Sequence, residues 1–84
     1  MDTWIEELAV ALALEPLSQE ETDRLLRMAR DVAHRVERKG APLASFLLGM
    51  DVARRTADGS ARAVALDGAT GVAEALLPLP PVQP

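Results

Sequence analysis

Apolar residues recur three or four positions apart along most of this chain, which is the spacing of one face of an α-helix. The clearest stripe lies within residues 18–39 and consists of Leu25, Ala29, Val32 and Val36, flanked by Leu26 and Ala33. Because a stripe of this kind is buried in a globular protein, we expect it to face a core. The stretch 18–39 is therefore predicted to be the longest helix, against which the rest of the chain folds.

Both ends of this predicted helix carry boundary signals. Ser18 is followed three residues later by Glu21, an arrangement typical of a capping box, in which two backbone amides are satisfied at a helix start. Gly40 stands just past Lys39, the last residue of the predicted helix, where a glycine commonly ends a helix.

Three further helices are predicted, over about 3–13, 42–58 and 61–77. Pro16 follows the first, because the residue before a proline is pushed out of the helical region. Gly59 ends the third helix, and Ser60 is placed to cap the fourth.

The fourth predicted helix has the weakest pattern. Gly68 and Gly71 lie inside it, and each glycine costs a helix about 1 kcal/mol relative to alanine. The dipeptide Asp67-Gly68 is equally compatible with a turn that splits the segment. A continuous helix and a broken one are both open at this point.

Two predicted helices have apolar residues on more than one face. On the first, the face expected to be buried carries Trp4, Ile5, Leu8 and Leu12. On the third, the stripe expected to be buried consists of Leu43, Phe46, Leu47, Met50, Ala53 and Ala57. The residues that fall away from these stripes are Val10, Leu14, Leu48 and Val52. These four either become buried inside the domain or form an apolar patch, which usually marks a protein interface.

The pattern as a whole predicts an all-α protein, a single small bundle of four helices in residues 1–77. The tail 78–84 contains four of the six prolines and is expected to be extended or polyproline II-like. No stretch approaches the length of a membrane span, and the start of the chain lacks a basic leader, so we expect a cytoplasmic protein.

Composition narrows the possible chemistry. The 84 residues include no cysteine, so disulfides, thiolate metal sites and thiol catalysis are excluded. The net charge is −4, but residues 1–23 carry seven acids and no base, whereas residues 24–62 carry all nine Arg and Lys. An acidic total and only two aromatic side chains are unlike a nucleic-acid-binding surface, so no nucleic acid partner is expected.

Candidate site residues cluster on the polar side of the longest helix. They are Arg30, His34, Arg35 and Arg38, and they could contact a phosphate. The alternative is a solvated face, because acids and arginines stand four residues apart in this helix and can neutralise one another. A single histidine does not make a metal site, and neither a phosphate-binding loop nor a nucleophile–base pattern is present. We therefore expect no enzyme activity, no metal and no cofactor.

The run Ala29-Arg30-Asp31-Val32-Ala33-His34-Arg35-Val36-Glu37-Arg38-Lys39, followed by Ala41-Pro42-Leu43 and Phe46-Leu47-Leu48-Gly49, resembles a small bacterial helical domain of unknown function. That domain is often labelled "molybdopterin-guanine dinucleotide biosynthesis protein" and is found beside or fused to molybdenum-cofactor guanylyltransferases. The glycine-rich nucleotide loop of those enzymes has no counterpart here, since Gly68-Ala69-Thr70-Gly71 lacks its arginine and its strand. The resemblance thus implies a helper role rather than nucleotidyl transfer.

Two functional hypotheses follow. The first is a non-catalytic interaction module, a homodimer that docks through apolar helix faces and assists molybdenum-cofactor guanylyl transfer. The second is a small accessory protein that grips a nucleotide or pterin phosphate with Arg30, His34, Arg35 and Arg38.

Overall fold

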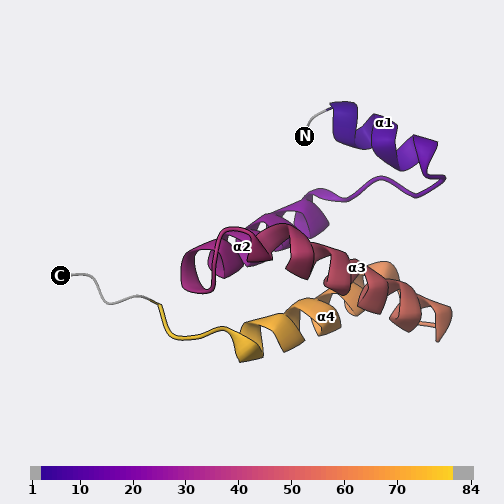
Figure 1. Cartoon of the computed structure of the whole chain (residues 1–84). Helices are drawn as coiled ribbons and strands as arrows, with labels where there is room; N and C mark the ends of the chain where they lie inside the picture. The colour runs from indigo at the N-terminus through magenta and orange to yellow at the C-terminus, as the bar shows by residue number, and fades with distance from the viewer. Residues whose placement is uncertain (1–2, 81–84) are drawn as a thin grey trace.

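The structure, a computed structural model, describes residues 3–80 and contains four helices (Figure 1). They are α1 (Thr3–Ala11), α2 (Gln19–Arg35), α3 (Gly40–Ala57) and α4 (Arg62–Leu76). No strand occurs within residues 3–80, so the predicted all-α class is confirmed. The predicted boundary between the helical domain and the tail, after residue 77, follows closely on the end of α4.

Helix α2 begins as predicted but ends four residues early. Ser18 caps it: its Oγ accepts the Glu21 amide at 3.1 Å, and its own amide donates to the Glu21 carboxylate at 2.8 Å. At the other end, Val36 leaves the helical region (φ −111°, ψ −82°). Gly40 then begins α3 instead of following the end of α2, and it lies so close to Val32 that a Cβ there would be 3.2 Å from the Val32 Cγ1.

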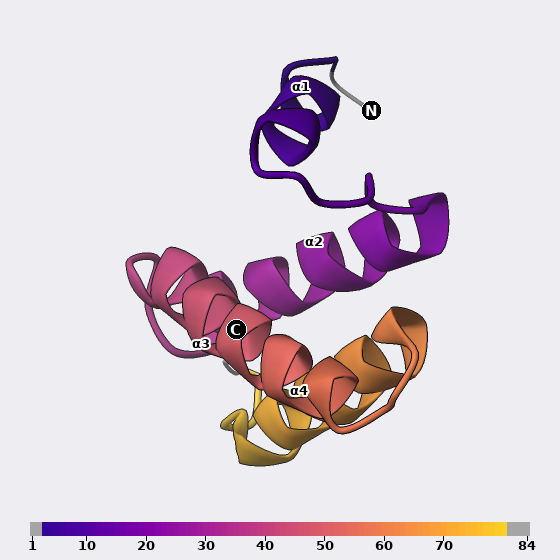
Figure 2. The ribbon, with the colours of Figure 1, turned by 90° about the vertical axis from the view of Figure 1, so that its right-hand side faces the viewer.

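Helices α2, α3 and α4 pack together around a small core (Figure 2). The core consists of Met28 and Val32 from α2, Leu48 from α3, and Ala69 from α4. Ala65 and Ala69 are almost completely buried, and their small side chains allow α4 to approach its neighbours closely. Val32 is buried as predicted, whereas Val36 lies past the helix end and is exposed.

The prediction of which face of α3 is buried is wrong, because the opposite face packs against the core. Leu48 is only 8% exposed and the half-buried Val52 packs against the core, so of the two alternatives for these residues burial holds, and Leu48 is not part of an exposed interface. The stripe expected in the core is instead open, with its four large side chains between 57% and 70% exposed: Leu43, Phe46, Leu47 and Met50. Asp51 and Arg55 flank the buried stripe and pair with each other at 2.7 Å.

Helix α1 stands apart from the other three helices (Figures 1 and 2). Ile5 and Ala9 are half-buried, but the rest of its predicted core face is exposed, so the expectation that this face is buried is wrong. Val10 and Leu14 are exposed, in agreement with their predicted positions. A nine-residue helix is short for independent stability in water, so α1 depends on what covers it.

Helix α4 is continuous through both of its glycines, which excludes the broken alternative. Gly68 has a packing role, because the Arg55 guanidinium occupies the place of a Cβ, with its Nη1 2.5 Å from that position. Gly59 has the expected left-handed backbone (φ 106°), but Ser60 does not cap α4, whose N-cap is Ala61. Residues 78–80 are exposed and irregular, and the rest of the predicted tail, 81–84, lies outside the described residues.

Candidate functional site

The outer side of α3 carries four large apolar side chains that are each more than half exposed. We call Leu43, Phe46, Leu47 and Met50 the outer apolar face. At 100° per residue these side chains point away from Leu48 and therefore away from α2 and α4. Large apolar side chains on one face are more informative than the same number scattered singly, because a contiguous patch marks an interaction site.

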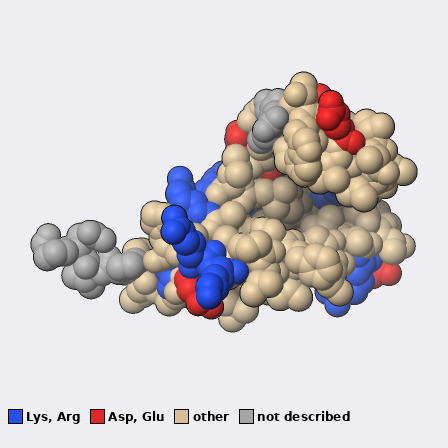
Figure 3. Space-filling model, turned by 45° about the horizontal axis from the view of Figure 1, so that its top comes forward, with Lys and Arg blue, Asp and Glu red and all other residues tan. Residues whose placement is uncertain are grey.

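A groove of about 450 Å³ lies between α1 and α3. It adjoins the outer apolar face because Gly49 and Ala53, which line it, follow Phe46 and Met50 by three residues, the spacing of neighbours on a helix surface. Ile5, Leu8 and Leu12 line one wall, and Val52 and Ala53 line the other. Figure 3 shows the corresponding hollow beneath the part of the surface that α1 forms. We call it the α1–α3 groove.

A second groove, of about 320 Å³, lies where α2, α3 and the start of α4 meet. Its lining includes Leu25, Leu26 and Leu66. It shares four residues with the first groove: Leu17, Gly49, Val52 and Arg62. The two grooves are therefore neighbours, joined along α3. At Gly49 a Cβ would meet no atom within 4 Å, so there is open space above α3 at this point.

Arg62 holds the segment that connects α1 to α2. Its guanidinium bonds both carboxylate oxygens of Glu21, at 2.6 and 2.7 Å, and donates to the backbone carbonyls of Glu15 at 2.7 Å and Pro16 at 2.8 Å. The hydrogen bond from Arg62 is the main reason that the pKa of Glu21 falls from its ordinary 4.5 to about 2, and Glu21 in turn raises the pKa of Arg62. The segment between α1 and α2 is thus held by the first turn of α4.

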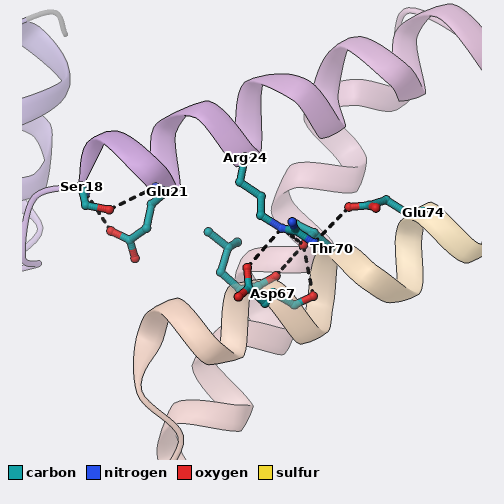
Figure 4. A network of polar contacts seen from close by, with 7 residues as sticks. Ser18, Glu21, Arg24, Asp67, Thr70 and Glu74 are labelled. Carbon is teal, nitrogen blue, oxygen red and sulfur yellow. Dashed lines mark hydrogen bonds and ion pairs between the residues drawn. The ribbon is translucent and has the colours of Figure 1, made fainter.

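A second polar network joins α2 to α4 (Figure 4). Arg24 donates to the Thr70 hydroxyl at 2.6 Å and pairs with Asp67 at 3.3 Å and Glu74 at 3.2 Å. Thr70 is completely buried and donates in turn to the Leu66 carbonyl at 2.8 Å. Arg24 is therefore engaged across the helix interface, and not with Glu20 one turn away as its spacing suggested.

The four residues predicted to contact an anion lie near the end of α2. His34 is exposed as expected, Arg35 is half-buried, and Arg38 is exposed in the turn after the helix. Arg30 is exposed, with its Nε 3.7 Å from an Asp31 oxygen. Neither groove described above is lined by them, so anion binding stays a prediction.

Sequence reasoning missed the pair Glu21–Arg62. The two residues are 41 positions apart, so no helical spacing connects them, and only the capping role of Glu21 was visible. The outer apolar face was recognised as apolar but assigned to the core.

Within residues 3–80, no cluster of three or more acidic or histidine side chains is arranged to hold a metal ion. The described helices also include none with the length and hydropathy needed to cross a membrane.

These features define a small all-helical domain with an open apolar surface. The chain belongs to the family described as "Domain of unknown function (DUF6457)", whose model matches residues 1–79. Neither a curated protein nor a solved structure matches the chain. The match supports the small domain of unknown function expected from the sequence, and it contains nothing that connects the chain to molybdopterin-guanine dinucleotide biosynthesis.

Proposed function

We propose that this protein is a non-catalytic interaction module whose partner docks on the outer apolar face and the adjoining α1–α3 groove. The observation that carries this proposal is the exposure of four large apolar side chains on one side of α3, each more than half open to solvent. Covering them would remove apolar surface from water, which is the main favourable term in protein association.

The composition of the α1–α3 groove favours a protein partner over a small polar ligand. Small-molecule sites combine apolar walls with a few convergent polar groups that fix the orientation of the ligand. Here the walls are mainly Ile, Leu, Val and Ala, and the one arginine in the lining is engaged by Glu21 and by two backbone carbonyls. Apolar side chains from a helix or loop suit such a groove better than a phosphate does.

The same contacts support a role without catalysis. Glu21 and Arg62 border the grooves, but each is satisfied by the other, and the lowered pKa of Glu21 makes it a poor general base near neutral pH. Arg24 is likewise held by three partners on α4.

A narrower proposal names the setting in which the module works. The sequence resemblance given above supports a molybdenum-cofactor guanylyltransferase as one partner, in the cytoplasm. This narrower proposal depends on the resemblance alone, and mixing the purified protein with such an enzyme and measuring complex formation tests it directly.

Photo-cross-linking in cells tests the docking surface. A photoreactive amino acid in place of Phe46 should give a cross-linked protein adduct, whereas the same amino acid in place of Arg27, exposed on α2, should not. The variant Gly49→Leu, which adds a side chain where the structure has open space, should reduce the adduct at position 46 without unfolding the protein. No adduct at position 46, or equal adducts at both positions, would contradict the proposal.

A further inference from the structure

We infer that a partner of the outer apolar face is a second copy of this chain, bound antiparallel about a twofold axis that passes through this face. The inference rests on the proposed docking surface and adds the identity and orientation of what covers it. It is carried by the distribution of charge at the two ends of α3.

One end of α3 lies beside an acidic element. Val52, Ala53 and Thr56, in the C-terminal half of α3, line the α1–α3 groove, so α1 lies over this end. Helix α1 carries two adjacent exposed carboxylates, Glu6 and Glu7, and no base. In Figure 3 the acidic side chains on α1 lie to the upper right of the uncharged surface.

The other end of α3 lies beside a basic turn. Arg38 and Lys39 are exposed and directly precede Gly40, the first residue of α3. In Figure 3 basic side chains lie on the left of the same uncharged surface, opposite α1, and a second group of mixed charge lies at the lower right.

At the C-terminal end of α3 itself, Arg54 and Arg55 both pair with Asp51. With the exposed Asp58 they form a group without net charge, so Glu6 and Glu7 of α1 make this end acidic. An 18-residue helix is about 27 Å long, more than twice the Debye length of about 8 Å at physiological salt, so the two charged ends do not neutralise each other within one chain.

A twofold axis near the middle of α3 makes these charges complementary. In an isologous dimer each contact occurs twice, so the acidic α1 of each copy lies against the basic turn of its partner. A parallel arrangement would instead bring like charges together at both ends, which is unfavourable. The apolar face lies between the charged ends in either case, and the charges select the antiparallel orientation.

The available apolar area requires both α1 and α3. With each large side chain contributing on the order of 100 Å², the four residues of the outer apolar face supply about 400 Å² per copy. A stable interface of standard size buries about 800 Å² per partner. The remainder can come from Leu8 and Val10 of α1 and from Leu12, which directly follows it, because these side chains are also exposed.

Sedimentation equilibrium of the purified full chain tests the inference. We expect a reversible dimer with a dissociation constant in the micromolar range, weakened by added salt. The double variants Glu6→Lys/Glu7→Lys and Arg38→Glu/Lys39→Glu should each weaken the homodimer by about tenfold or more. An equimolar mixture of the two variants should form a heterodimer within a few-fold of the wild-type affinity, because both charge contacts are restored in it.

The control Arg27→Glu/Arg30→Glu makes the same change in net charge as Arg38→Glu/Lys39→Glu, but on α2, and it should leave dimerisation unchanged. A wild-type protein that stays monomeric up to about 1 mM would overturn the inference. So would charge-reversal variants that dimerise as well as wild type, or folded variants, verified by circular dichroism, whose mixture does not associate. A monomeric protein that still gives an adduct from position 46 in cells would refute the second copy but leave the docking surface standing.

Discussion

The interface between α2 and α4 and the surface formed by α1 and α3 use opposite kinds of side chain. Between α2 and α4, small alanines lie beside a buried threonine, and two arginines are engaged by carboxylates and carbonyls. Across α1 and the outer side of α3, large leucines, a phenylalanine and a methionine remain open, and a groove lies between the two helices. The first region is packed within one chain, whereas the second is open to solvent.

This difference separates residues that fold the protein from residues that are free to bind. Substitutions in the α2–α4 interface should change the free energy of unfolding, because every group there has a partner in the same chain. Substitutions on the outer apolar face should leave that free energy nearly unchanged and affect association instead.

The largest expected effect is that of Arg62→Ala. It leaves the carboxylate of Glu21, whose side chain is 7% exposed, without its cation and removes the hydrogen bonds to the carbonyls of Glu15 and Pro16. We therefore expect the free energy of unfolding to fall by about 3–5 kcal/mol. Urea unfolding followed by circular dichroism measures it. The matched control is Arg54→Ala, whose side chain is mostly exposed and pairs with Asp51 at the surface, and it should cost less than about 1 kcal/mol. Equal losses of unfolding free energy for the two variants would show that the Arg62–Glu21 pair stabilises the fold no more than a surface ion pair does.

Two neighbouring leucines on α3 give the sharpest comparison of the two regions. Leu48→Ala removes buried atoms from the core and should cost about 2–4 kcal/mol, whereas Leu47→Ala, at a side chain 64% exposed, should cost less than about 0.5 kcal/mol. The urea midpoints of the two variants, taken at a concentration where the protein is monomeric, measure the difference. If Leu47→Ala were the more damaging substitution, the assignment of the faces of α3 would be wrong.

The Glu21–Arg62 pair should also make stability depend on pH. Because folding lowers the pKa of Glu21 from 4.5 to about 2, the folded state favours the ionised form, and the pair contributes fully above about pH 5. The contribution, about 3 kcal/mol at about 1.4 kcal/mol per pKa unit, is lost as the pH falls from about 4.5 to about 2. The quantity to measure is the difference in unfolding free energy between wild type and Glu21→Gln, which should shrink across this window. A difference that stays constant from about pH 6 to about pH 2.5 would contradict the assigned pKa.

The sequence was sufficient for the features that depend on local chemistry. The four helices, the Ser18–Glu21 capping box and the left-handed Gly59 each follow from residues close together in the chain, and the structure has all three. The exposure of His34 follows from its helical spacing relative to Val32.

The sequence alone did not predict which of the two apolar faces of α3 is buried. Helix α3 has large apolar residues on one side and the sparser stripe of Ala44, Leu48 and Val52 on the other, and periodicity favours the larger side. The smaller side is buried because α4 presents alanines at close range and because Arg55 fits over Gly68. Which face of α3 is buried therefore depends on the neighbouring helix. The pair of Arg62 with Glu21 likewise forms only when α4 packs beside α2.

Amide hydrogen exchange at two protein concentrations tests most directly the claim that α1 and α3 form an open surface completed by a partner. At about 5 μM, amides of α1 should exchange far faster than those of Ala65 to Thr70 in α4, and at about 500 μM exchange in α1 should slow while that in α4 stays unchanged. Amides of α1 that are as protected as those of α4 at the lower concentration, or that exchange equally fast at both concentrations, would contradict it.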